Sequence, residues 1–190
     1  MSQNENRTEV SHGSLTSNVG ILRHCVAEMG LNYIRGEDAG AKERPPGVDV
    51  TIVSFLDAKG EPGVITILFT HQSSLILSFA HLIGIDASWS VDVALRVINL
   101  LNHDLFTLGK LDLDEGNFMI RYSLNYQGAE KALSTIKVID YLTTFFEQAS
   151  KLQGFLSGLS KSSDDAEGVL LKVKAFIDSM REEKIFSTLA

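Results

Sequence analysis

Five apolar side chains alternate with mostly polar ones in one short stretch, and this pattern restricts the fold more than any other. They are Phe118, Ile120, Tyr122, Leu124 and Tyr126. Because successive side chains of a β-strand point to opposite faces of a sheet, the spacing predicts a strand with one apolar face. The preceding residues 114–117 are typical of a turn, and we expect a β-hairpin with Gly116 in a left-handed conformation.

The other strand of this hairpin is predicted at Phe106–Leu113. Its apolar phase changes from Phe106 and Leu108 to Leu111 and Leu113. An extra residue in one strand of a pair produces such a change, so we expect a β-bulge at Gly109-Lys110.

Three further strands are predicted earlier in the chain. Val48–Leu56 and Val64–Phe69 are rich in β-branched and aromatic residues, and residues 57–63 between them contain one proline and two glycines. Leu75–Leu82 follows a second polar break, residues 71–74, and continues the antiparallel meander.

Four segments carry apolar residues at helical spacing. The first begins at Ser17 or Asn18 and stops at Gly30, and the second begins at Ser88 or Ser90 and runs through Leu101. A long helix is predicted from Glu130 toward Leu156, and a closing helix carries the stripe Leu170, Val173, Ile177 and Met180.

Together these elements predict an α+β fold. We expect a twisted antiparallel sheet of about five strands flanked by helices, in the order α-β-β-β-α-β-β-α, with one more helix at the C-terminal end. The polar residues 1–16 are predicted to be a disordered lead-in, residues 17–159 the α+β domain, and residues 160–190 a linker with the closing amphipathic helix. A chain of 190 residues, 44% of them hydrophobic, suffices for one core.

The charge balance restricts the partners of the chain. Acidic residues outnumber basic ones by 24 to 17, for a formal net charge of −7. A phosphate backbone or an anionic lipid surface is repelled on average by such a chain, so neither nucleic acid nor membrane is an expected partner. The single cysteine and the polar first residues lack the features of a secreted protein, which favours the cytoplasm.

No stretch of the sequence has the pattern of a catalytic, cofactor-binding or metal site. Residues 112–117 resemble the start of a calcium loop, but Gly116 stands at the fifth position instead of the sixth, and Ser123 replaces the twelfth-position glutamate. Cys25 lies on the apolar stripe of the first helix, which favours a buried thiol over a nucleophile. We therefore predict a non-enzymatic protein without catalytic residues, cofactor or metal.

Two segments carry more apolar surface than one core requires. The predicted strand 75–82 is apolar on both faces, and the long helix has a stripe widened by three residues. We expect these segments to meet a partner or a second copy of the chain. The candidate residues for partner binding or self-association are Leu75, Ile76, Leu77, Phe79, Val138, Tyr141 and Phe145. Coverage of this surface by the closing helix is the alternative.

Several short motifs resemble a known family. Asn99-Leu100-Leu101-Asn102, Gly109-Lys110-Leu111, Asp112, Asp114-Glu115-Gly116 and Arg121, taken with the order of elements, resemble the YbjN-like family of bacterial sensory-transduction regulators. The resemblance covers roughly residues 15–155, and implies a fold like that of type III secretion chaperones, often dimeric and binding other proteins without catalysis. This chain departs from the family in its polar lead-in and its closing helix.

Two functions from different classes agree with these observations. The first is a non-catalytic protein-interaction module, a regulator or adaptor with chaperone-like binding of an unknown protein partner, itself a homodimer. The alternative is a small-molecule sensor or enzyme with a pocket between sheet and helices, to which His81, Tyr122 and Arg121 supply polar groups.

Overall fold

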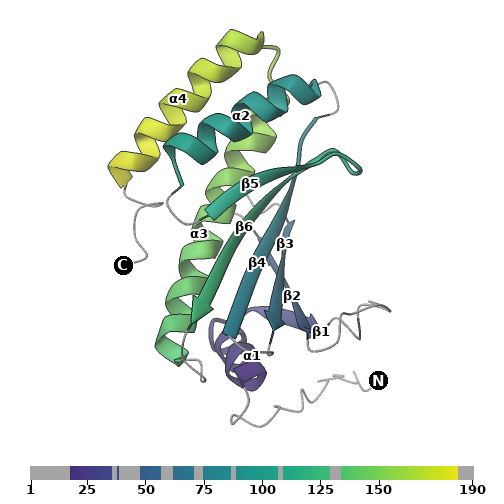
Figure 1. Ribbon diagram of the computed structural model, residues 1–190, viewed down its shortest axis with the longest axis vertical. Helices are drawn as coiled ribbons and strands as arrows, with labels where there is room; N and C mark the ends of the chain where they lie inside the picture. Colours follow the sequence, from purple (N-terminus) through teal and green to yellow (C-terminus); the bar gives the residue numbers. More distant parts are fainter. Residues whose placement is uncertain are drawn as a thin grey trace, which may run out of the picture.

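In the part of the chain that the structure describes, one antiparallel sheet packs with four helices (Figure 1). The computed structural model describes residues 18–35, 38, 48–56, 62–70, 75–86, 89–106, 109–128 and 134–183. The strands are β1 (Asn32–Arg35), β2 (Val48–Leu56), β3 (Pro62–Thr70), β4 (Leu75–Gly84), β5 (Gly109–Asp114) and β6 (Met119–Gly128). The helices are α1 (Asn18–Glu28), α2 (Val91–Asp104), α3 (Thr135–Ser160) and α4 (Ala166–Glu183).

The sheet has six strands in the order β1-β2-β3-β4-β6-β5, and every neighbouring pair is antiparallel. The predicted α+β class is confirmed, but the predicted number of five strands is wrong. The additional strand is β1, whose four residues pair with β2 through partners such as Tyr33 and Val53. So short a segment shows too few alternations to be recognised in the sequence.

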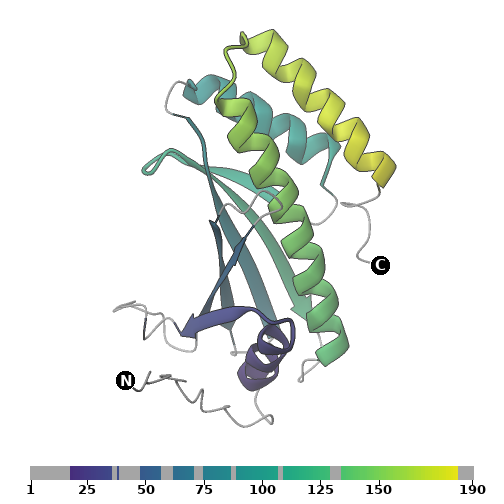
Figure 2. The ribbon, with the colours of Figure 1, turned by 180° about the vertical axis from the view of Figure 1, so that it is seen from behind.

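The described helices lie on one side of the sheet or beyond its end. Figure 2 shows α3 running along one face of the strands, with α1 beside its first turns, and α2 and α4 together near the end of α3. α1 contacts α3, β1 and β2, whereas α2 contacts β5 and α4. The result is a two-layer arrangement with one covered sheet face.

The predicted bulge at Gly109-Lys110 is wrong. β5 begins at Gly109 and pairs residue for residue with β6, from Gly109 opposite Leu124 to Asp114 opposite Met119. Phe106 precedes the strand and stacks on Tyr122, with ring centroids 5.3 Å apart. The change of apolar phase therefore marks the start of the strand.

The hairpin between β5 and β6 is confirmed, but its left-handed residue is not the predicted one. Phe118 has φ of +50°, and Gly116 is absent from the positive-φ residues in the described part of the chain. The Asp114 carboxylate accepts hydrogen bonds from the backbone and side-chain nitrogens of Asn117, at 3.3 and 3.0 Å. These bonds close the turn and lower the pKa of Asp114.

The helix ends follow their local sequence signals. Gly30, with φ of +72°, lies just beyond α1, and Ser90 caps α2 by accepting a hydrogen bond from the Val93 backbone nitrogen at 3.2 Å. α3 continues to Ser160, four residues beyond the predicted end at Leu156. The predicted start at Glu130 and the predicted lead-in 1–16 lie outside the described residues.

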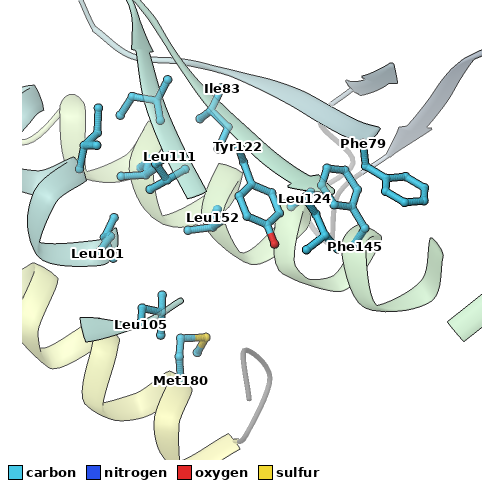
Figure 3. Packing of buried hydrophobic residues seen from close by; sticks show 14 of the residues in the cluster. Phe79, Ile83, Leu101, Leu105, Leu111, Tyr122, Leu124, Phe145, Leu152 and Met180 are labelled. Carbon is cyan, nitrogen blue, oxygen red and sulfur yellow. The ribbon is translucent and has the colours of Figure 1, made fainter. Parts of the chain in front are cut away.

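The core lies between the covered sheet face and the helices (Figure 3). Tyr122 of β6 stacks on Phe145 of α3 with ring centroids 5.0 Å apart and planes 9° apart. Phe79 of β4 contacts the same phenylalanine at 5.3 Å. These rings join the neighbouring strands β4 and β6 to α3, and each is fully buried.

The closing helix α4 completes the core at the far end of α3. Phe176 stacks on Phe155 of α3 with centroids 4.0 Å apart, and Arg181 Nε donates to the backbone oxygen of Asp104 in α2 at 3.1 Å. A surface ion pair of 3.0 Å joins Lys151 to Glu183. α4 therefore packs against α2 and the second half of α3.

Substitution of two glycines tests this packing. At Gly109 a Cβ atom would lie 2.7 Å from Tyr122 Cε2, whereas Gly158, exposed on α3, has no atom within 4 Å of such a Cβ. We expect Gly109→Ala to lower the free energy of unfolding by about 1–3 kcal/mol through overpacking. The matched Gly158→Ala should raise it by about 0.5–1 kcal/mol through helix propensity. Urea denaturation of both variants measures the difference, and equal effects would contradict the packing described.

Candidate functional site

Three of the residues expected to meet a partner are buried inside the chain. Phe79, Val138 and Phe145 are at most 2% exposed and belong to the core. Tyr141 is partly buried and packs against the same core. These four residues therefore contribute to folding, and the interpretation of Phe79, Val138 and Phe145 as surplus surface is wrong.

The apolar stripe of α3 is wide because two neighbouring elements, the sheet and α1, pack against this helix. The sheet contacts one flank of α3, and α1 contacts its first half, where Cys25 Sγ donates to the backbone oxygen of Thr135 at 3.9 Å. The alternative that α4 covers this part of the helix is also wrong, because the contacts of α4 lie near Lys151 and Phe155. Ile136, in the first turn of α3, is 73% exposed.

The remaining candidates, Leu75, Ile76 and Leu77, form the beginning of β4. They pair with Gly128, Gln127 and Tyr126 of β6, one strand position after another. Their side chains lie outside the described part of the structure. The structure thus brings Phe79, Val138, Tyr141 and Phe145 together in the core and places the other three only by their backbone.

Two polar side chains on the covered face are paired with glutamines of α3. His81 and Tyr122 are opposite each other on β4 and β6, and both are at most 1% exposed. His81 Nε2 lies 2.7 Å from Gln153 Oε1, and the Tyr122 hydroxyl donates to Gln148 Oε1. Burial raises the pKa of Tyr122 far above its usual value. The tyrosine is therefore a neutral hydrogen-bond donor at physiological pH.

Arg121 does not join these two residues. It follows Ile120 and precedes Tyr122 on β6, and the alternation of a strand directs it to the opposite face of the sheet. There its Nη2 atom lies 3.4 Å from Asp112 Oδ2, and Lys110 Nζ lies 3.3 Å from the same oxygen. The three polar groups proposed for a pocket are thus divided between two faces.

The face that carries Arg121 is open to solvent and partly apolar. Leu82, directly opposite Arg121 on β4, is 45% exposed, and Ile34 of β1 is 50% exposed. Ile34 pairs with Ile52 of β2, and both alternate with residues of the covered face. We call the residues Ile34, Ile52, Ala80, Leu82, Lys110, Asp112 and Arg121 the open face. Its residues on β1, β2 and β4 are apolar, and its residues on β5 and β6 are charged.

At one edge of the sheet, the backbone of a β5 residue is bonded by a side chain that the sequence pattern did not assign. Asn102 of α2 donates from Nδ2 to the backbone oxygen of Leu111 at 2.9 Å and accepts from the Leu111 backbone nitrogen at 2.7 Å. An amide side chain here replaces the backbone of a further strand. The only signal in the sequence is a polar residue immediately after the apolar stripe of the helix.

The thiol and the acidic groups offer little for chemistry. Cys25 is fully buried, and burial raises the pKa of its thiol. Among the described residues, no cluster of three histidine, cysteine or acidic side chains is placed to hold a metal ion. In the same ranges, every helix is too short or too polar to cross a bilayer.

Comparison with known proteins gives no relative. No protein-family model, curated protein or solved structure matches the chain.

The burial of Tyr122 predicts how the free energy of unfolding changes at alkaline pH. The pKa of the Tyr122 phenol is higher in the folded chain than in the unfolded chain, so above pH 10.0 the unfolded chain loses this proton first. The free energy of unfolding is therefore unaffected by this group at lower pH and decreases as the pH rises above 10.0. We expect the free energy of unfolding of the wild type to fall more steeply between about pH 9.5 and 11 than that of Tyr122→Phe. Below pH 9 the variant should be less stable by about 1–2 kcal/mol, because the hydrogen bond from the phenol to Gln148 Oε1 is lost. Parallel alkaline slopes in urea titrations would contradict the burial of the phenol.

Proposed function

We propose that this chain is a non-catalytic protein-interaction module that binds a segment of a partner protein on the open face of its sheet. The observation that carries the proposal is the difference between the two faces. The covered face holds the aromatic core, whereas the opposite face presents Leu82 and Ile34 to solvent at 45% and 50% exposure. Apolar side chains presented by a rigid sheet are typical of a surface that binds another protein.

The arrangement of charge on the open face indicates the chemistry of the partner segment. Leu82 and Ala80 lie beside Arg121 and Ser123 of β6, and Lys110 follows on β5. Two cations share the single carboxylate of Asp112, which leaves positive charge next to the apolar residues. A helix or extended segment with apolar side chains and a neighbouring carboxylate complements this surface.

The geometry supports this module more than the alternative sensor or enzyme. A pocket that binds a small molecule needs polar groups that converge and remain available to the ligand. His81 and Tyr122 face α3 and bond to Gln153 and Gln148, while Arg121 lies on the other face.

The broader assignments rest on the sequence. Membership of the YbjN-like family, a regulatory or adaptor role with chaperone-like binding, and a cytoplasmic location remain proposals. The motifs that suggest the family lie close together in space: Asn102 bonds to Leu111, and Arg121 to Asp112. In this chain they belong to one structural unit formed by α2, β5 and β6.

Affinity capture with matched variants tests the proposed surface. Leu82→Lys places a charge in the apolar part of the open face, and Leu171→Lys makes the same change at a residue of α4 that is 70% exposed. From the native lysate, we expect proteins retained by the wild type and by Leu171→Lys to be lost with Leu82→Lys. For a retained protein, Arg121→Glu should weaken binding at least about tenfold if its segment is acidic. Equal retention by Leu82→Lys and the wild type would refute the open face as the binding surface.

A further inference from the structure

Four polar side chains form a block on the open face of the β5–β6 hairpin. Lys110 and Asp112 of β5 lie directly opposite Ser123 and Arg121 of β6. Because residues two positions apart in a strand share a face, all four side chains project from the same side of the sheet. An ammonium, a guanidinium and a hydroxyl can donate hydrogen bonds here, and the carboxylate of Asp112 is the charged acceptor among the four. The block therefore has more donors than its own acceptor can satisfy.

Asp112 holds the two cations only loosely. Lys110 Nζ lies 3.3 Å from Asp112 Oδ2 and 3.4 Å from Oδ1, and Arg121 Nη2 lies 3.4 Å from Oδ2. Charge-assisted hydrogen bonds between such groups are normally about 2.7–2.9 Å long. The lysine and arginine side chains are 59% and 50% exposed, and exposed ion pairs contribute little to stability. Another carboxylate can therefore replace that of Asp112 at small cost.

Ser123 lacks a partner inside the chain. Its Oγ atom is buried and has no hydrogen-bond partner within the described residues. Burial of a hydroxyl without a partner lowers stability, because its hydrogen bond to water is lost and not replaced. Its two neighbours across the strands, Ala80 and Lys110, have no acceptor in their side chains. The side chain of Lys110 is flexible and largely exposed, so it can move to admit an acceptor from another molecule.

We propose that Lys110, Arg121 and Ser123 bind an acidic side chain of the partner protein, and that Asp112 occupies the place of this side chain in the free chain. The proposal rests on the binding surface proposed above. On binding, an aspartate or glutamate of the partner accepts hydrogen bonds from the two cations and from the Ser123 hydroxyl, while Asp112 turns toward solvent. We call these four residues the carboxylate subsite.

The surroundings of the carboxylate subsite determine which partner group fits. Asp112 shows that an aspartate carboxylate can lie between the two cations. Leu82, 45% exposed, lies directly opposite Arg121, so the residue beside the partner's acidic side chain should be apolar. The net charge of −7 gives an acidic partner no general attraction to the chain. Recognition therefore depends on these local donors.

Selection of peptides from a phage-displayed library against the intact chain tests the proposal. We expect selected peptides that lose binding to Leu82→Lys to carry an aspartate or glutamate next to an apolar residue. In a synthetic copy with blocked ends, replacing the acidic residue by its amide should weaken binding at least about tenfold. Tighter binding of a copy with phosphoserine at that position, or of one whose carboxylate is its C-terminus, would overturn the assignment to an acidic side chain.

Substitutions in the chain separate recognition from a structural role. Asp112→Asn removes the internal carboxylate, and should strengthen binding of the acidic peptide at least about threefold. Asp164→Asn is the matched control, because Asp164 pairs with Lys172 elsewhere and is 29% exposed, compared with 31% for Asp112. It should leave binding unchanged. Ser123→Ala should weaken binding about tenfold without lowering stability in urea, because the hydroxyl that it removes is unpaired in the free chain.

The outcomes distinguish failure of the subsite from failure of the binding surface. If the selected peptides depend on Leu82 but lack an acidic residue, or bind Asp112→Asn no more tightly than the wild type, the subsite is refuted and the surface is retained. An equal gain with Asp164→Asn would also refute it, because net charge alone would then explain the effect. If no selected peptide depends on Leu82, both proposals are wrong.

Discussion

The fold depends on the environment of one ring, that of Tyr122. It lies between Phe145 of α3 and Phe106 before β5, with centroids 5.0 and 5.3 Å away, and its hydroxyl donates to Gln148. Its edge occupies the space where Gly109 would carry a side chain. Elements distant in sequence are thus held by one residue, because an aromatic side chain buries a large area and also needs a hydrogen-bond partner. The side chains of the covered face are buried in this packing, so the open face is the one that remains for binding.

Strong local signals made much of the fold predictable. The alternation from Phe118 to Tyr126 correctly indicated β6, and β2 has the predicted bounds because Val48–Leu56 is bounded by turn residues. The cap at Ser90 and the stop at Gly30 identified helix ends for a similar reason. Each of these patterns involves residues only a few positions apart, so it can be recognised in the sequence without knowledge of tertiary contacts.

The errors arose where tertiary contacts decide the outcome. In the sequence, Gly109 resembles a bulge residue. In the structure, a glycine fits this position because the ring of Tyr122 on β6 approaches it closely. Phe145 and Val138 gave α3 a surplus of apolar residues only if one neighbour was assumed, whereas α1 and the sheet both contact the helix. Asn102 bonds to the backbone of Leu111 at the sheet edge, and no spacing in the sequence indicates this pair of bonds. The second apolar face of residues 75–82 was predicted, but the side of the sheet that stays open was not, because it depends on which face the helices cover.

The central claim is that one sheet face is core and the other is a binding surface, and hydroxyl-radical footprinting of the purified chain tests it most directly. At a concentration where the chain is monomeric, we expect Leu82 and Ile34 to be oxidised readily, and Phe79, Tyr122 and Phe145 to be protected. Addition of a captured partner should protect Leu82 and leave the core residues unchanged. Protection of Leu82 in the isolated monomer, or oxidation of Tyr122 at the rate of Leu82, would contradict the division between the two faces.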